Sequence, residues 1–238
     1  MSRSVRSRRG ATGAASGRGR QEARTLERAS TPRGDFALRR RGDELDLIAS
    51  GVFAISTEDG HSERQLVDVA LAGRQDACVL IGGLGFGYSV EAALDAGAAH
   101  AVVVEHEPLV AEWFSRYLPD RAATLLGDAR IELVIGDFVS FVRDGEGEYT
   151  AICADIDNGP DILTAPANAD LYRRPWLESA ARSLRSGGRL ALWCADRNEH
   201  LESALSSVFS TVDVIPCDAR RGPADVIYLA EDPRRSIR

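Results

Sequence analysis

Apolar and polar positions alternate along this chain of 238 residues in a pattern that predicts a series of strands and helices. From residue 77 onward, short apolar runs alternate with segments whose apolar positions repeat at helical spacing. The predicted strands are 77–82, 101–105, 131–135, 150–155, 189–195, 211–216 and 225–230, and the predicted helices are 88–97, 108–117, 170–185 and 198–208. This alternation predicts an α/β fold with a doubly wound, mostly parallel seven-stranded sheet.

A smaller group of elements precedes this series. Residues 36–41, 44–48 and 52–56 are short segments with apolar side chains, separated by turn residues, and they predict a small β-meander. Residues 62–72 carry apolar side chains at helical spacing and predict a helix. We therefore expect three parts: a tail over 1–34, a small β-region over 35–58, and the α/β domain over 59–238.

The N-terminal tail differs from the remainder in charge. Residues 1–41 hold 12 arginines and three acids, for a net charge of +9, whereas the rest of the chain has a net charge of −16. The first 33 residues are rich in Arg, Ser, Gly and Ala and contain almost no large apolar side chains, so we expect disorder. A tether to nucleic acid or a membrane surface, an organellar transit peptide and an over-extended start remain alternatives. The arginine-only usage indicates a GC-rich bacterial genome, which disfavours the transit peptide.

A glycine-rich turn carries the clearest chemical information. The apolar run Val79–Ile81 leads into Gly82, Gly83, Gly85 and Gly87, and an alanine-rich helix follows at once. A strand, a glycine turn and a helix start, in that order, form a corner that binds nucleotides. The next predicted strand ends at Glu105, where a carboxylate can accept hydrogen bonds from ribose hydroxyls. We therefore expect an adenosine-containing ligand.

Two motifs that are absent from the chain narrow the type of adenosine ligand. Tyr88 stands where the dinucleotide fingerprint GxGxxG requires its third glycine, and the chain has no lysine for a phosphate-binding P-loop. The spacing Gly83-x-Gly85-x-Gly87 fits the looser glycine loop of enzymes that bind S-adenosylmethionine or its relatives. An ordinary tight turn is the alternative for the glycines alone.

Acidic residues gather where the predicted strands end, which is where ligands bind in open α/β sheets. These acids are Glu105, Glu107, Asp137, Asp155, Asp157 and Asp196. Asp137 is placed to accept a hydrogen bond from an adenine amine, or to cap the helix from Phe138, or both. Asp155 ends the central strand and could hold an amine nucleophile and take its proton.

Composition narrows the class of protein further. No apolar run approaches the ~18 residues that span a bilayer, and no signal-peptide core follows the basic N-terminus. The four cysteines are scattered without metal-ligand spacing, so we expect free thiols, a reducing cytoplasm and no metal. The four histidines are dispersed and form no catalytic pattern with Ser or Cys. Neither a membrane nor a nucleic acid is expected as a partner.

The order of short motifs over residues 36–231 resembles the spermidine synthase (polyamine aminopropyltransferase) family. The motifs are Gly82–Gly87, Val104–Glu107, Tyr117-Leu118-Pro119, Ile135-Gly136-Asp137, Asp155 with Asn158 and Pro160, Leu171-Tyr172, and Ser186-Gly187-Gly188. The resemblance implies a class I methyltransferase-like Rossmann domain and a homodimer paired partly through the β-region. It implies that the glycine loop and Glu105 hold the methionine part and ribose, and that Asp137 contacts adenine. It further implies that Asn158 and Tyr172 face the acceptor and that Asp155 deprotonates the attacking amine.

Three departures from the family pattern bear on function. Gly85 stands where the family has the aspartate that binds the aminopropyl ammonium of the donor. Glu63 lies near the place of a tyrosine that contacts polyamines, and Asn158 replaces a second acid. We therefore keep three hypotheses: transfer of an aminopropyl group from decarboxylated S-adenosylmethionine to a small-molecule amine, methyl transfer from S-adenosylmethionine, and a degenerate homologue that acts as a binding module.

Overall fold

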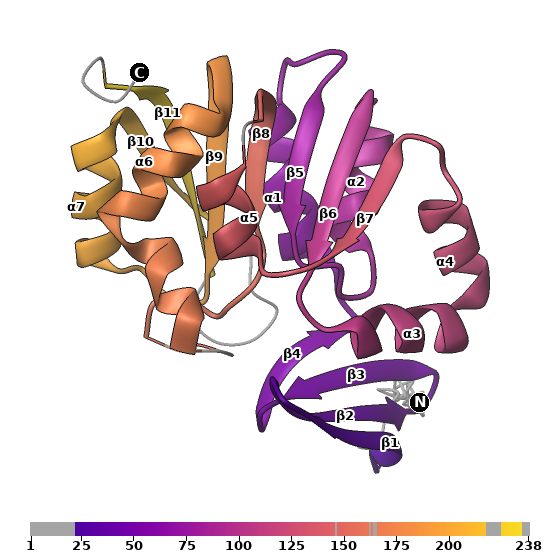
Figure 1. Ribbon diagram of the computed structural model, residues 1–238. Coiled ribbons are helices and arrows are strands. Elements are labelled where there is room, and N and C mark those ends of the chain that lie inside the picture. The colour runs from indigo at the N-terminus through magenta and orange to yellow at the C-terminus, as the bar shows by residue number, and fades with distance from the viewer. Residues whose placement is uncertain (1–21, 146, 162, 164–165, 218–224, 235–238) are drawn as a thin grey trace, which may run out of the picture.

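The computed structural model describes residues 22–145, 147–161, 163, 166–217 and 225–234 of the chain, which form two sheets (Figure 1). The smaller sheet is an antiparallel meander in the order β1-β2-β3-β4. Its strands are β1 Arg24–Thr31, β2 Gly34–Arg41, β3 Glu44–Ala49 and β4 Val52–Ser56. Leu38, Leu45 and Leu47 of this sheet are buried in the same core as residues of the larger sheet. The meander therefore packs onto the α/β domain, and its predicted strands are confirmed.

The larger sheet has seven strands, as predicted, and their order is β10-β11-β9-β8-β5-β6-β7. Its strands are β5 Cys78–Gly82, β6 His100–Glu105, β7 Ile131–Ile135, β8 Tyr149–Ala154, β9 Leu184–Cys194, β10 Phe209–Pro216 and β11 Val226–Pro233. Strands β9, β8, β5, β6 and β7 are parallel, whereas β11 is antiparallel to both β9 and β10. Strand order reverses between β5 and β8, so the binding crevice of such a sheet lies beyond the carboxyl ends of these two strands.

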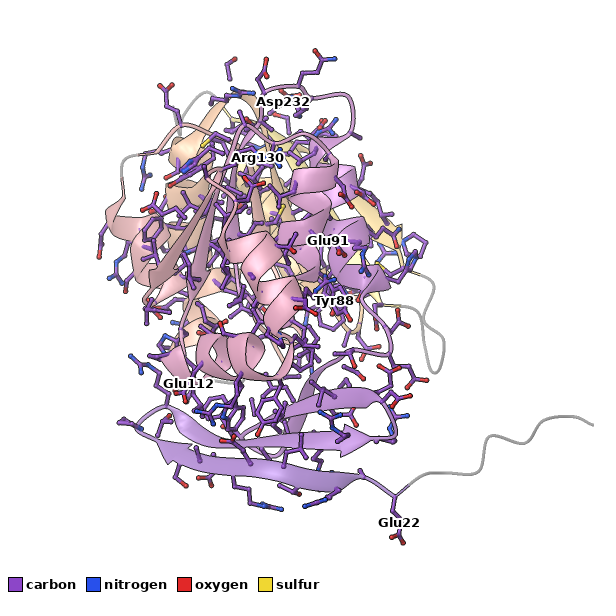
Figure 2. All side chains as sticks on the ribbon, turned by 90° about the vertical axis from the view of Figure 1, so that its right-hand side faces the viewer. Glu22, Tyr88, Glu91, Glu112, Arg130 and Asp232 are labelled. Atoms are coloured by element: carbon purple, nitrogen blue, oxygen red, sulfur yellow. The ribbon has the colours of Figure 1, made fainter. Side chains whose placement is uncertain are left out.

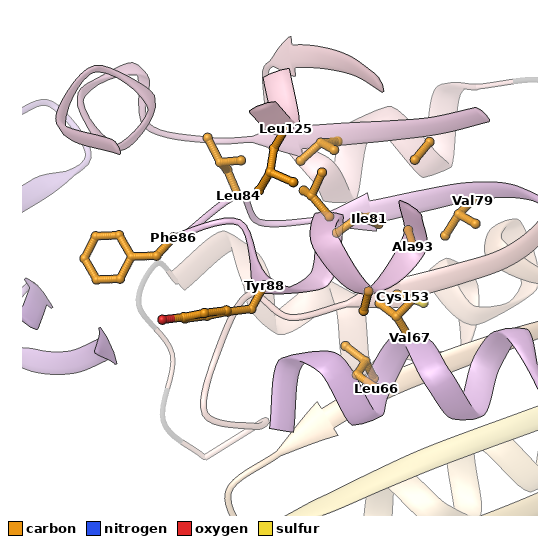
Figure 3. Close-up of a cluster of buried hydrophobic side chains, with 14 of the residues drawn as sticks. Leu66, Val67, Val79, Ile81, Leu84, Phe86, Tyr88, Ala93, Leu125 and Cys153 are labelled. Atoms are coloured by element: carbon orange, nitrogen blue, oxygen red, sulfur yellow. The ribbon is translucent and has the colours of Figure 1, made fainter. Parts of the chain in front are cut away.

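Helices cover both faces of this sheet (Figure 1). They are α1 His61–Leu71, α2 Tyr88–Asp95, α3 Pro108–Tyr117, α4 Pro119–Leu126, α5 Phe138–Asp144, the 3₁₀ helix η1 Pro166–Tyr172, α6 Arg174–Ser183 and α7 Glu199–Val208. Side chains alternate across β5, so Val79 and Ile81 pack with α1 to α4, whereas Leu80 packs with α5 to α7. Figure 3 shows the first of these clusters, in which Leu66 and Val67 of α1 lie against the sheet.

The start of the meander corrects the predicted tail. Residues 24–31 were expected to be disordered, but they form β1 and pair with β2. Leu26 and Ala29 pack against the core, and Glu27 accepts hydrogen bonds from Trp113 Nε1 at 3.0 Å and Tyr117 Oη at 2.5 Å. Averaging composition over the arginine-rich segment concealed this strand, so the expected boundary at residue 35 is wrong. Residues 1–21 of the predicted tail lie outside the described residues.

The predicted helix over 170–185 is also corrected. The segment contains the end of η1, a separate helix α6 that begins at Arg174, and the first residues of β9. Pro175 lies in the first turn of α6, where its missing N–H is not needed, so a new helix starts there. Leu184 pairs with Tyr149 of β8, which ends the helix at Ser183. Within the described ranges, no helix is long and apolar enough to cross a membrane.

Candidate functional site

A cavity lies where the meander meets the carboxyl ends of the parallel strands. The meander contributes the apolar side chains of Phe36, Leu47 and Ile55 to its wall. The larger sheet contributes the glycine loop, the residues after β6, Asp137, and the residues after β8. The cavity thus lies at the strand ends, where ligands bind in open α/β sheets, and the meander closes it from the opposite side.

The glycine loop divides into two buried and two cavity-lining positions. Gly83 and Gly85 line the cavity, whereas Gly82 and Gly87 are buried behind it. Gly83 has φ 93°, and a Cβ there would lie 2.5 Å from the backbone oxygen of Asp155, so only glycine fits. Gly85 has φ 50°, and a Cβ there would lie 2.9 Å from Ile55 Cδ1. These two residues form a backbone cradle that a ligand can approach closely.

Tyr88 explains why the loop lacks a third glycine. Its ring is stacked between the guanidinium groups of Arg64 and Arg121, at 4.4 and 4.6 Å from the ring centroid. Both arginines also donate to Glu91, and the Tyr88 hydroxyl donates to the carbonyl of Thr57 at 3.0 Å. In Figure 2, Tyr88 lies between Glu91 and the meander. The aromatic ring therefore joins the meander to α1, α2 and α4 at a position where a dinucleotide loop needs open space.

Glu105 lies at the end of β6, is buried, and lines the cavity. Its Oε2 accepts from the backbone N–H of Leu84 at 2.9 Å, and its Oε1 accepts from that of Glu107 at 2.8 Å. Burial raises its pKa, and these backbone hydrogen bonds oppose the rise. The carboxylate is thus fixed beside the glycine loop with lone pairs left for a ligand.

Asp137 caps helix α5 and also lines the cavity. Its Oδ1 accepts from Ser140 N at 2.6 Å, which is the capping role that the sequence left open. Its Oδ2 lies 4.0 Å from Nδ1 of His106, another cavity residue. One carboxylate oxygen therefore caps the helix while the other faces the imidazole of His106, for which the sequence indicates no role.

Asp155 follows β8 and lies beside the glycine loop, since its N–H donates to the carbonyl of Gly82 at 3.1 Å. Its Oδ2 accepts from Ser89 Oγ at 3.4 Å. Burial, followed by the negative charge of Glu63, raises the pKa of Asp155 to about 8, against an ordinary value of 3.8. A carboxyl group with a pKa near neutrality can exchange protons with an amine, which suits a general base.

The two expected acceptor residues are placed differently. Asn158 lines the cavity, and its backbone oxygen accepts from Ala195 N at 3.2 Å. Tyr172 is buried in the second core cluster at the end of η1 and is not part of the cavity wall, and burial raises the pKa of its hydroxyl. The structure therefore brings Asn158, but not Tyr172, into the cavity formed by Gly83, Gly85 and Glu105.

Other cavity residues were not predicted from the sequence. Ser89 lies two residues after Gly87 and contacts Asp155, whereas Arg33 comes from the β1–β2 turn and lies 4.0 Å from Glu107. Trp193 near the end of β9 also lines the wall, and its buried Nε1 has no hydrogen-bond partner among the described residues. Trp193 lies near the end of a predicted strand, and this position could have indicated that it lines the cavity. In the described part of the chain, no group of three or more His, Cys, Asp or Glu side chains could hold a metal ion.

Comparison with known proteins finds related sequences. A family model described as "Spermine/spermidine synthase domain" matches residues 64–216. Spermidine synthase 1 of Pisum sativum is 30% identical over 146 residues, which cover 60% of this chain and 42% of the relative. Putrescine N-methyltransferase 1 of Nicotiana tabacum is 35% identical over 112 residues, covering 46% of this chain and 28% of the relative. The chain thus spans less than half the length of these curated relatives.

A solved structure shows the same fold. The crystal structure of a spermidine synthase in complex with the transition-state analogue AdoDATO superimposes with a TM-score of 0.74 and 19% sequence identity. The superposition covers 87% of this chain and 73% of that one. The expected α/β architecture with a preceding meander is therefore confirmed.

Proposed function

This chain belongs to the spermine/spermidine synthase family, and on that basis we propose that it transfers an aminopropyl group from decarboxylated S-adenosylmethionine to an amine acceptor. One observation carries the proposal. The glycine cradle at Gly83 and Gly85, the fixed carboxylate of Glu105 and the acid Asp155 all line one cavity. A site with a nucleoside cradle and a base of raised pKa is suited to this transfer.

The nucleoside would be held by groups already in place. Glu105 would accept hydrogen bonds from the ribose hydroxyls, because its oxygens are fixed by Leu84 N and Glu107 N. Asp137 would accept from the adenine amine with the oxygen that does not cap α5. The donor's sulfonium would lie near the backbone of Gly83 and Gly85, which both line the cavity.

Asp155 would act on the acceptor amine. The donor supplies a carbon activated by its positively charged sulfur. An acceptor enters as an ammonium ion, and Asp155 in its carboxylate form takes one proton from it, leaving a neutral amine. The amine nitrogen then forms the new C–N bond as the C–S bond breaks, and the product leaves as a protonated secondary amine. Asp155 afterwards releases its proton to solvent, which its pKa of about 8 permits near neutral pH.

Methyl transfer from S-adenosylmethionine is the second candidate, and one observation favours it. Position 85 has no acid for the ammonium of an aminopropyl donor, and Ile55 lies where such a side chain would begin. S-adenosylmethionine carries a carboxylate in addition to its ammonium, so it depends less on an acid there. Relatives of 34–35% identity over part of this chain are named putrescine N-methyltransferases.

The two reactions leave different nucleosides behind, which allows a test without knowledge of the acceptor. The full chain is incubated with each donor and a panel of primary amines that includes putrescine, and the nucleoside product is identified by mass spectrometry. Amine-dependent methylthioadenosine from decarboxylated S-adenosylmethionine is the expected result. S-adenosylhomocysteine alone would replace the proposal with methyl transfer. Neither product from any amine would contradict both.

A further inference from the structure

Glu63 brings a second carboxylate into the cavity wall beside Asp155. It lies in the first turn of α1, and its backbone carbonyl accepts a hydrogen bond from Ser89 Oγ at 3.4 Å. The same hydroxyl contacts Asp155 Oδ2 at 3.4 Å, so the start of α1 is held directly against the proposed base. These two acids therefore share one small region of the cavity, although they come from distant segments of the chain.

No salt bridge within the described residues neutralises this pair. Arg64 follows Glu63 in the sequence, but its guanidinium donates to Glu91 and to the carbonyl of Gly60 and stacks on Tyr88. Across the described residues, neither Glu63 nor Asp155 forms a salt bridge, and the only side-chain hydrogen bond to Glu63 is from Ser62 at 2.9 Å. Burial raises the pKa of Glu63 and the negative charge of Asp59 adds to the rise, while its hydrogen bonds and the nearby charge of Arg64 oppose it. Two close acids without a salt-bridged cation form a favourable place for a positively charged ligand.

We propose that Glu63 is a specificity-determining residue of the acceptor site: its carboxylate and that of Asp155 together hold the ammonium group of a primary amine. The inference rests on the proposed function for the role of Asp155. It assigns to α1 a negative charge at the acceptor side of the cavity, where Asn158 supplies none. The chain would thus select a cationic amine with an acid from a different element than its family pattern uses.

Binding measurements test this inference separately from catalysis. Putrescine is titrated by calorimetry into the full chain saturated with methylthioadenosine, for the wild type, Glu63→Gln, Glu63→Asp and Glu58→Gln. Glu58 lies on the link between β4 and α1, pairs with Arg41 and is not part of the cavity wall, so its variant controls for loss of nearby charge. We expect Glu63→Gln to weaken putrescine binding about 30-fold or more, as for a buried charge contact.

The expected pattern has three further parts. Glu63→Asp should retain part of the putrescine affinity, Glu58→Gln should retain all of it, and methylthioadenosine affinity should change in none of the variants. Unchanged putrescine binding in Glu63→Gln, or no putrescine binding to the wild type, would overturn the inference. A parallel loss of methylthioadenosine would also overturn it, by showing a role in the nucleoside site. Absence of turnover with the expected binding pattern would refute only the proposed function.

Discussion

Replacement of Asp155 with asparagine should make the chain more stable and much less active. The carboxyl group lies between the glycine loop and Ser89, in a cavity wall that also contains Glu63. Burial and the neighbouring acid make its charged form costly, as its pKa of about 8 shows. Asparagine has nearly the same shape and no charge, so the variant removes this cost. A functional acid held in an unfavourable environment commonly reduces stability in this way.

The size of the effect follows from the two pKa values. A rise from 3.8 to about 8 corresponds to about 6 kcal/mol at about 1.4 kcal/mol for each pH unit, and this is an upper limit. Asp155 is partly exposed to the cavity, where water screens its charge, so we expect a gain of about 1–3 kcal/mol at pH 8. For a chain of this length, that gain raises Tm by several degrees, at about 2–4 °C per kcal/mol.

The stabilisation should depend on pH with a definite sign. Between pH 3.8 and about 8, the folded chain keeps the proton on Asp155 while the unfolded chain loses it. The free energy of unfolding of the wild type therefore falls as pH rises through this window and levels off above it. The Asp155→Asn variant lacks this contribution, so the two proteins should converge near pH 4 and diverge towards pH 8.

The assay combines thermal unfolding at pH 4 to 9 with turnover of the donor. Asp144→Asn serves as the control, because Asp144 is an exposed acid that pairs only with its neighbour Arg143 among the described residues. Turnover of Asp155→Asn should fall by about 10² or more through loss of the base, while methylthioadenosine affinity is kept. An Asp155→Asn variant that is no more stable than the wild type at pH 8 would refute the electrostatic reasoning, and undiminished turnover would remove Asp155 from the mechanism.

Two other changes test the loop and its support. Gly85→Asp combined with Ile55→Ala should raise the preference for decarboxylated S-adenosylmethionine over S-adenosylmethionine by about tenfold, because a new charge contact forms. Competition binding measures this preference, with Ile55→Ala alone as the control. An unchanged preference would show that position 85 does not face the donor ammonium. Tyr88→Ala should lower the free energy of unfolding by about 3 kcal/mol or more, because a buried ring stacked between two arginines is lost. Urea unfolding measures this loss. Tyr88→Phe should lower the free energy of unfolding by only about 1 kcal/mol, because it removes the hydroxyl alone. Equal losses in both variants would show that the ring contributes little.

Much of the fold could be predicted because its strongest patterns are local. Strand β5 is a short apolar run with both faces buried, and the glycines after it require their own backbone conformations, so strand, turn and helix α2 were evident. Strand β1 could not be found in this way. Its few apolar side chains lie among arginines, and its stability depends on pairing with β2 and on contacts from Glu27 to helix α3.

The candidate site residues were likewise predictable where a local pattern marks them and not where tertiary packing places them. Glu105 ends β6, and Asp137 and Asp155 follow β7 and β8. The topology of a parallel sheet brings the ends of neighbouring strands together, so these residues could be predicted. The position of Tyr172 depended on η1, a short helix whose packing against α5 and α6 has no local pattern in the sequence. The meeting of Glu63 with Asp155 likewise arises from packing of α1 against α2 and the sheet, which no local spacing indicates.

Recognition of the ribose by Glu105 is the central claim, and ligand binding tests it most directly. Calorimetry compares methylthioadenosine with its analogue lacking the 2′ and 3′ hydroxyls, on the wild type and on Glu105→Gln. We predict one bound methylthioadenosine per wild-type chain, a loss of about tenfold or more for the analogue, and a smaller difference between the two ligands on Glu105→Gln. No binding of methylthioadenosine, or equal affinity of the wild type for both ligands, would contradict the account.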